Sequence, residues 1–342
     1  MINLRDKGAE FWERSNHPVR ILTVLVILAV VAALPFAKDS FLQTPIAAFD
    51  AVLVYPMGIF ILMAMGLNVV VGKSGLLDLG YVAFFAVGAY TMAILGTHTG
   101  LNTWEIMPFG IGFAMLAGLI LAIPTLRLRG DYLAIVTLGF GEIVRIIAVN
   151  TEKIGGALGI AGIPFPPGLG FEYQLLDQKY FYWTVIVLIL IVIWVVRRLS
   201  VRRPGRAWES IRQDEDAAEL MGVSTYKYKI WAFVFGAAIG GGAGVFYASR
   251  SMVIAPDNFT LNTSILILAC VVFGGMGNIW GVIVGAAILG YLPDRFRFLS
   301  DARLLLFGVV LVVFMNLRPE GILPRKKREK KHVTHISTGE SK

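Results

Sequence analysis

The sequence predicts an all-α, polytopic membrane protein with about ten transmembrane elements. Composition and length lead to this prediction. Hydrophobic residues make up 56% of the 342 residues and charged residues only 16%, whereas a soluble domain carries about 25% charged residues. At roughly 20 residues per bilayer crossing, the chain holds eight to ten spans and has no room for a separate soluble catalytic domain.

Ten apolar runs mark the predicted elements in order: Ile21–Phe36, Ile46–Val71, Leu76–Leu95, Ile106–Leu126, Tyr132–Val149, Tyr180–Val196, Ile230–Tyr247, Ile265–Phe273, Ile279–Tyr291 and Leu304–Leu317. We expect the first run to be retained as a helix, although a cleavable signal peptide has a similar pattern. The eighth and ninth runs are short and are separated by Gly274, Gly275 and Gly277. We therefore expect a tilted, broken or re-entrant pair that protein or water covers.

The distribution of charge sets the orientation. Of the 31 Lys and Arg residues, 23 fall on the side of the N-terminus and seven on the other side, so both termini are expected in the cytoplasm. The chain then divides into a cytoplasmic segment 1–20, a transmembrane domain 21–317 and a basic cytoplasmic tail 318–342. Residues 151–179 form an external loop and residues 197–229 an internal one. The net charge of +8 lies beside the spans, which indicates contact with the bilayer and not with nucleic acid.

Residues that could carry enzyme chemistry are scarce. None of the four histidines pairs with the single cysteine, Cys270, in a metal-binding spacing. The segment Gly72-Lys73-Ser74 resembles the end of a phosphate-binding loop, but the required glycine at position 67 is replaced by Leu67. We therefore expect no catalytic residue, no metal and no cofactor. Transport driven by ATP would need its ATPase on another chain.

The internal loop contains one predicted amphipathic helix, Arg206–Met221, which would be about 24 Å long. The segment has no Gly or Pro, and Gly222 follows it as a natural C-terminal cap. Four apolar residues share one face of this helix: Ala207, Ile211, Ala218 and Met221. Such a helix either docks in a groove on a partner or lies on the bilayer surface, and composition leaves both open.

Two patterns inside the spans are candidate pore or gating features. One face of the seventh run carries glycines at four-residue spacing, Gly236, Gly240 and Gly244. They let helices approach closely, for static packing or as a sliding surface. Glu142 and Arg145 lie three residues apart near the expected membrane midplane, where ionisable groups must be paired or hydrated. This pair either lines a pore or fixes helix packing. Asp78 lies near the inner surface, where we expect it to orient a loop.

Five segments occur in order along the chain: Gly66–Phe84, Leu126–Arg145, Gly205–Gly222, Gly274–Gly281 and Arg318–Pro324. Together they resemble the LivM-type permeases of branched-chain amino-acid ABC importers. The resemblance covers about residues 55–325. Each segment alone is moderately specific, and five in order are highly specific. The first segment contains Asn68 and Asp78, which join the candidate pore or gating residues.

The resemblance implies a complex in the bacterial inner membrane with two cytosolic ATPases, a second, LivH-like permease and an external solute-binding protein. The chain itself would be a non-catalytic transport subunit for leucine, isoleucine and valine. Its predicted amphipathic helix would seat in the ATPase through Arg206, Ile211, Glu215, Ala217, Ala218, Met221 and Gly222. The alternatives are a permease for urea or short amides and, from another class, a self-sufficient secondary transporter or channel.

Overall fold

The computed structural model describes residues 29, 31–36, 49–125, 128, 130–168, 173, 178–295, 308, 309, 312, 316, 318 and 321–323. The segment 1–20, most of the first and last apolar runs and most of the basic tail lie outside these residues. Within them, six helices are long and apolar enough to cross a membrane, and two shorter apolar helices accompany them. The helical, multi-pass architecture is confirmed, while the count of ten elements stays a prediction.

The second apolar run forms one kinked rod, Phe49–Lys73. In its apolar 18-residue stretch, 83% of the residues are buried. The rod consists of α3 (Phe49–Val52), the π-helical η2 (Leu53–Gly58), α4 (Ile59–Leu67) and the π-helical η3 (Asn68–Lys73). The kink lies at Tyr55, whose backbone is extended because it precedes Pro56. The rod is therefore a central element of the bundle.

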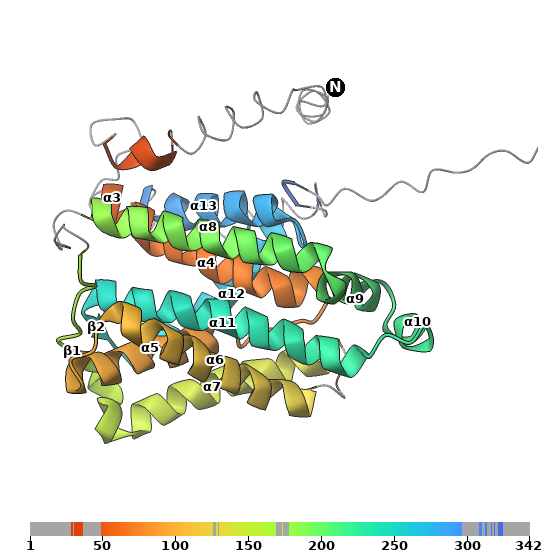
Figure 1. Ribbon diagram of the computed structural model, residues 1–342, viewed down its shortest axis with the longest axis horizontal. Coiled ribbons are helices and arrows are strands. Elements are labelled where there is room, and N and C mark those ends of the chain that lie inside the picture. Colours follow the sequence, from red (N-terminus) through yellow and green to blue (C-terminus); the bar gives the residue numbers. More distant parts are fainter. Residues whose placement is uncertain are drawn as a thin grey trace, which may run out of the picture.

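The third to ninth runs form the remaining long helices, and several of these helices extend beyond the apolar run that predicted them. These are α5 (Val82–His98), α6 (Thr103–Thr125), α7 (Asp131–Asn150), α8 (Lys179–Val201), α11 (Thr225–Ser251), α12 (Leu261–Gly274) and α13 (Ile279–Arg295). Figure 1 shows them running nearly side by side, with α11 between a group containing α4, α8 and α13 and a group containing α5, α6 and α7. Accordingly, α11 packs most extensively on α6, α5 and α4.

Small residues permit this close packing around α11. A Cβ atom built on Gly241 would lie 2.4 Å from the Cβ of Ala114 on α6, and one on Gly88 of α5 would lie 2.1 Å from the carbonyl oxygen of Gly241. These helices therefore meet backbone to backbone, as expected where van der Waals packing drives association in lipid.

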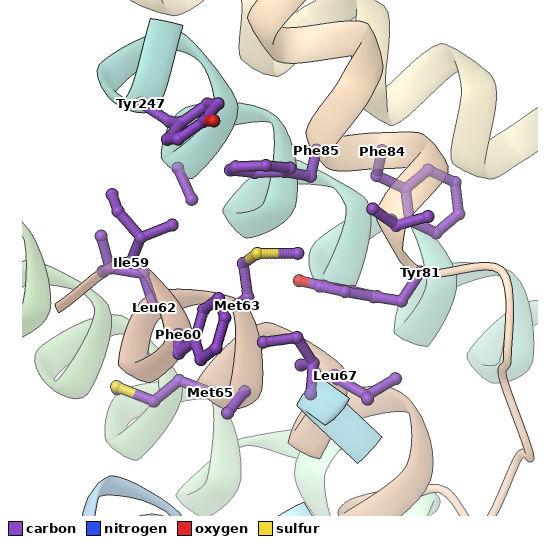
Figure 2. Packing of buried hydrophobic residues seen from close by; sticks show 14 of the residues in the cluster. Ile59, Phe60, Leu62, Met63, Met65, Leu67, Tyr81, Phe84, Phe85 and Tyr247 are labelled. Atoms are coloured by element: carbon purple, nitrogen blue, oxygen red, sulfur yellow. The ribbon is translucent and has the colours of Figure 1, made fainter. Parts of the chain in front are cut away.

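An aromatic and aliphatic core fills the space between α4, α5 and α11 (Figure 2). The ring of Tyr81 points toward Met63 of α4, and Phe85 lies beside Tyr247 with ring centroids 5.1 Å apart. By contrast, only 22% of the residues in the apolar 18-residue stretch of α7 are buried, and only 11% of those in α8. These two helices present broad apolar faces that lipid or another protein must cover.

The glycine-rich region separates two helices, α12 and α13. The helix α12 follows a 3-10 turn, η6 (Pro256–Phe259), across the extended residue Thr260, and together Pro256–Gly274 forms a 19-residue apolar segment. The eighth run is therefore longer than the nine residues assigned to it from hydropathy. A turn over residues 275–278 then reverses the chain into α13, and its glycines take left-handed angles, with φ of 113° at Gly275 and 87° at Gly277. The segment 256–295 is thus interrupted twice, at the extended Thr260 and at this turn.

The predicted loops lie at opposite ends of the bundle (Figure 1). One end carries the helices α9 (Arg203–Gln213) and α10 (Glu215–Leu220) of the internal loop. The other carries η4 (Glu152–Ile154), η5 (Gly156–Leu158) and the strand β1 (Ile160–Ala161) of the external loop. There β1 pairs with β2 (Val253–Ile254) in an antiparallel ladder, a small departure from the all-helical expectation within the described residues.

Candidate functional site

The predicted amphipathic helix of the internal loop is bent into two helices. Asp214 has an extended backbone (φ −162°, ψ 114°) between α9 and α10, and its carboxylate accepts the N–H of Ala217 at 3.0 Å. Asp214 thus acts as the N-cap of α10. The prediction of one continuous helix over Arg206–Met221 is wrong because an aspartate side chain can compete for backbone hydrogen bonds. We call residues 203–222 the elbow.

One face of the elbow is buried against the membrane domain. Trp208 is fully buried, and its indole N–H donates to the carbonyl oxygen of Tyr228 on α11 at 2.7 Å. Ile211 and Ala218 are each 5% exposed. The face predicted from the sequence is correct for Ala207, Ile211 and Ala218, although the prediction did not include Trp208. It is wrong for Met221, because the bend at Asp214 changes the helical register beyond it.

The outward surface of the elbow is apolar at its tip. Leu220 is 89% exposed and Met221 85% exposed. Figure 1 shows α10 projecting beyond the ends of the long helices. Three other predicted residues, Arg206, Ala217 and Gly222, are exposed as well. Sequence analysis missed Leu220 because the continuous helix assumed there did not place it on the apolar face.

Two cations fix the elbow to the membrane domain, and sequence analysis identified neither. The ammonium of Lys229 on α11, with a side chain 3% exposed, lies 2.5 Å from the Glu215 carboxylate. The guanidinium of Arg212 donates to the carbonyl oxygen of Gly72 at the end of η3 and to that of Met276 at 3.5 Å. The sequence feature that could have pointed to Lys229 is its position directly before the seventh apolar run. Arg212 is one of several arginines in the loop, and no sequence feature distinguishes it from the others.

Asn68, a predicted pore or gating residue, lies fully buried beside the turn 275–278. Its Oδ1 accepts the N–H of Gly277 at 2.8 Å, while its Nδ2 has no hydrogen-bond partner. A Cβ atom on Gly72 would lie 1.9 Å from this Oδ1 and 2.5 Å from the Gly277 nitrogen. Glycine at position 72 is therefore required for the contact between η3 and the turn.

Asp78 lies fully buried in the connection between η3 and α5, as expected for a residue that orients a loop. Its Oδ1 accepts the N–H of Gly80 at 2.9 Å, and its Oδ2 has no hydrogen-bond partner. Burial raises the pKa of Asp78 to about 7, although hydrogen bonds from Gly80 and Thr137 act in the opposite direction. The Thr137 hydroxyl on α7 accepts the N–H of Leu79 at 3.0 Å, which ties this connection to α7.

A cavity of about 220 Å³ lies where these parts meet. It is lined by the connection after η3, by the start of α7, by the elbow and by Lys229 of α11, and its lining residues include Ser74, Leu133, Glu215 and Asp216. The elbow therefore contacts the membrane domain through residues such as Arg212 and Glu215, and open space lies beside these contacts. Within the described ranges, no group of three or more His, Cys, Asp or Glu side chains is placed to hold a metal ion.

Glu142 and Arg145 form the predicted ion pair on α7, with their closest atoms 2.5 Å apart. Their side chains are 41% and 27% exposed, so the pair lies on the outer surface of the chain. Arg145 also lies 3.9 Å from Asp257 in η6. Beside the pair is a cavity of about 150 Å³, lined by residues such as Leu79, Gly141, Glu142 and Leu261.

The glycines of α11 lie on one face, as predicted. A Cβ atom would meet Val70 at 2.6 Å from Gly236, Phe84 at 3.2 Å from Gly240, and the Phe85 carbonyl oxygen at 2.1 Å from Gly244. The Tyr81 hydroxyl donates to the carbonyl oxygen of Gly236 at 2.8 Å. The face is therefore closely packed on α4, η3 and α5.

The chain is similar to known permeases over most of its length. Residues 51–315 match the family described as branched-chain amino acid transport system, permease component. The LivM permease protein of the high-affinity branched-chain amino acid transport system of Escherichia coli is 40% identical over 304 residues, which cover 82% of this chain and 72% of that protein.

More distant relatives carry related descriptions. A probable branched-chain amino acid transport permease, LivM of Methanocaldococcus jannaschii, is 28% identical over 76% of this chain and 84% of its own length. The LivH permease protein of Escherichia coli is 28% identical over 47% of this chain and 52% of its own length. No solved structure gives a significant match.

Proposed function

The chain belongs to the family of permease components of branched-chain amino acid transport systems, and from this membership we propose that it moves leucine, isoleucine and valine across the bacterial inner membrane. It does so as one transmembrane subunit of an ABC importer. The observation that carries the proposal is the 40% identity over 82% of the chain. It supports this function over a urea or short-amide permease and over a self-sufficient secondary transporter.

The partners follow from the same proposal. The second permease is LivH-like, since the LivH protein is itself a relative of this chain. Two cytosolic ATPases supply the energy, and an external binding protein delivers the amino acid. Both termini are cytoplasmic, which agrees with the excess of Lys and Arg on that side. The subunit itself catalyses no reaction.

The elbow is the proposed contact with an ATPase. A helix lying on the bilayer would turn its apolar face toward lipid. Here the apolar face with Trp208 and Ile211 is turned inward against the membrane domain. The side chains left outward at the projecting tip are Leu220 and Met221, and two exposed apolar residues at the end of a short helix suit a hydrophobic groove on a partner. This arrangement supports protein docking over membrane binding.

The partly exposed ion pair on α7 indicates where the translocation path lies relative to this helix. Glu142 lies roughly 16 Å along α7 from Asp131, and so near the bilayer midplane. Ionisable side chains facing lipid at that depth cost several kcal/mol. We therefore place this face of α7, with Glu142 and Arg145, toward a hydrated path shared with the second permease.

The docking proposal is tested in proteoliposomes that contain both permeases, the ATPases and the binding protein. The double substitution Leu220→Asp with Met221→Asp is expected to leave membrane insertion intact, because both side chains are exposed. Co-purification of the ATPases and ATP-dependent leucine uptake should both fall. Val201→Asp is the matched control, since Val201 is 77% exposed at the end of α8 and outside the tip. Normal ATPase binding by the double variant would refute the docking assignment.

A further inference from the structure

We propose that Arg212 is a positioning residue that transmits movement of the elbow to the α12–α13 turn, through the peptide group that joins Met276 to Gly277. This inference rests on the proposed function, because it assumes that an ATPase moves the elbow. It adds to that function a specific route by which the movement enters the membrane domain.

The Met276–Gly277 peptide is bound at both of its polar ends. Its carbonyl oxygen lies 3.5 Å from Nη1 of Arg212, and its N–H donates to Oδ1 of Asn68 at 2.8 Å. Arg212 comes from the elbow, whereas Asn68 is the first residue of η3. A single peptide group of the turn is thus bound by a cytosolic helix on one side and by a buried membrane helix on the other.

Arg212 also binds the end of η3 itself. Its guanidinium donates to the carbonyl oxygen of Gly72, one of the last carbonyl groups of that helix, and cations are favourable at this end of a helix dipole. The same side chain therefore joins two membrane elements, η3 and the turn. Moving α9 away from the membrane domain would release both at once.

Two glycines make these contacts possible. A Cβ atom on Gly75, where φ is 75°, would lie 3.0 Å from Cγ of Arg212 and 3.3 Å from its Cα. A Cβ atom on Gly72 would occupy the space of the Asn68 side chain and the Gly277 nitrogen. The connection is thus shaped to bring the backbone of α9 directly against the end of η3.

The turn 275–278 also forms hydrogen bonds with other parts of the chain. The side chain of Asn278 donates to the carbonyl oxygen of Leu323 at 2.9 Å. The N–H groups of Ile322 and Leu323 donate to Phe273 and Gly274 at the end of α12, at 2.9 and 3.2 Å. A displacement of the turn therefore involves α12, α13 and the segment 321–323 together.

The elbow has a second attachment to a different helix. Glu215 follows Asp214 directly and pairs with the buried Lys229 of α11. Arg212 and Glu215 thus lie on either side of the bend, one bound to η3 and the turn and the other to α11. The cavity of about 220 Å³ beside them leaves space for the elbow to move. The elbow can therefore change the position of the turn relative to α11.

The test uses Arg212→Gln in the complete complex of both permeases, the ATPases and the binding protein. We expect the variant to assemble and to hydrolyse ATP, because Arg212 is directed at the membrane domain and away from the exposed tip. The ATP hydrolysed per leucine taken up should rise about tenfold, the order of factor that loss of a hydrogen bond from a charged group produces. Arg212→Lys keeps the charge and should restore part of the coupling.

Arg203→Gln is the matched control, since it removes an exposed arginine from the first position of the same helix. Its ratio of ATP to leucine should equal that of the unsubstituted complex. An unchanged ratio in Arg212→Gln would overturn the inference while leaving the proposed function intact. If the unsubstituted complex shows no ATP-dependent leucine uptake, the proposed function itself fails. Loss of ATPase binding in Arg212→Gln would also overturn the inference, because it would place Arg212 in the docking surface.

Discussion

Asparagine in place of Asp78 is expected to stabilise the folded chain at pH 8, whereas most substitutions destabilise a protein. Asp78 is fully buried, its Oδ1 accepts the N–H of Gly80, and its Oδ2 has no hydrogen-bond partner. An asparagine retains the acceptor for Gly80 and carries no charge. The unfavourable burial of a carboxylate is thereby removed without a change in side-chain volume.

The size and sign of the effect follow from the pKa of Asp78. Burial raises it from 3.8 to about 7 in the folded chain. Between these values the unfolded chain binds fewer protons than the folded one, so stability decreases as the pH rises and then levels off above pH 7. One pKa unit corresponds to about 1.4 kcal/mol, so the buried carboxylate costs about 4 kcal/mol at pH 8 and less than half of that at pH 5. Asp78→Asn should abolish this dependence.

Thermal unfolding in detergent provides the assay, because the single cysteine, Cys270, is buried and reacts with a thiol-specific dye on unfolding. At roughly 2 °C per kcal/mol, the unfolding midpoint of Asp78→Asn should exceed that of the unsubstituted chain by about 8 °C at pH 8 and by less at pH 5. Asp131→Asn, which removes an exposed carboxylate at the start of α7, is the control. A lower midpoint for Asp78→Asn at pH 8 would refute the reasoning.

Three further outcomes are expected. Gly88→Val should reduce the yield of monodisperse protein in size-exclusion chromatography, because its Cβ would lie 2.1 Å from a carbonyl oxygen of α11. Trp208→Phe should lower the free energy of unfolding by about 1–3 kcal/mol in the thiol assay, since the partly buried carbonyl of Tyr228 loses its 2.7 Å hydrogen bond. Glu142→Leu should reduce membrane insertion by removing the carboxylate 2.5 Å from Arg145 and leaving only the 3.9 Å contact with Asp257, and adding Arg145→Leu should restore insertion but not leucine uptake.

The membrane helices could be predicted from the sequence because lipid offers no alternative to backbone hydrogen bonds. An apolar run of sufficient length must form a helix there, and each run within the described residues does so. The packing face of α11 was predictable for a related reason. Glycines at positions 236, 240 and 244 share one helical face whatever surrounds it, and the structure places them against α4, η3 and α5.

The structure of the internal loop could be predicted only in part. Its helical residues were identified, but the bend at Asp214 depends on one side chain capping one N–H group, and the sequence permits a continuous helix equally well. Arg212 and Lys229 bind partners that are distant in sequence, at Gly72, Met276 and Glu215. Such contacts depend on how the spans pack together, which neither hydropathy nor helical periodicity contains.

The most direct test of the account is leucine accumulation in proteoliposomes with the ATPases present or omitted. We propose that this chain has no energy source of its own and is moved through its elbow. With both permeases, the binding protein, the ATPases and ATP, leucine should accumulate above its external concentration. Without the ATPases it should not. Accumulation against a gradient by the two permeases and the binding protein alone would contradict the account.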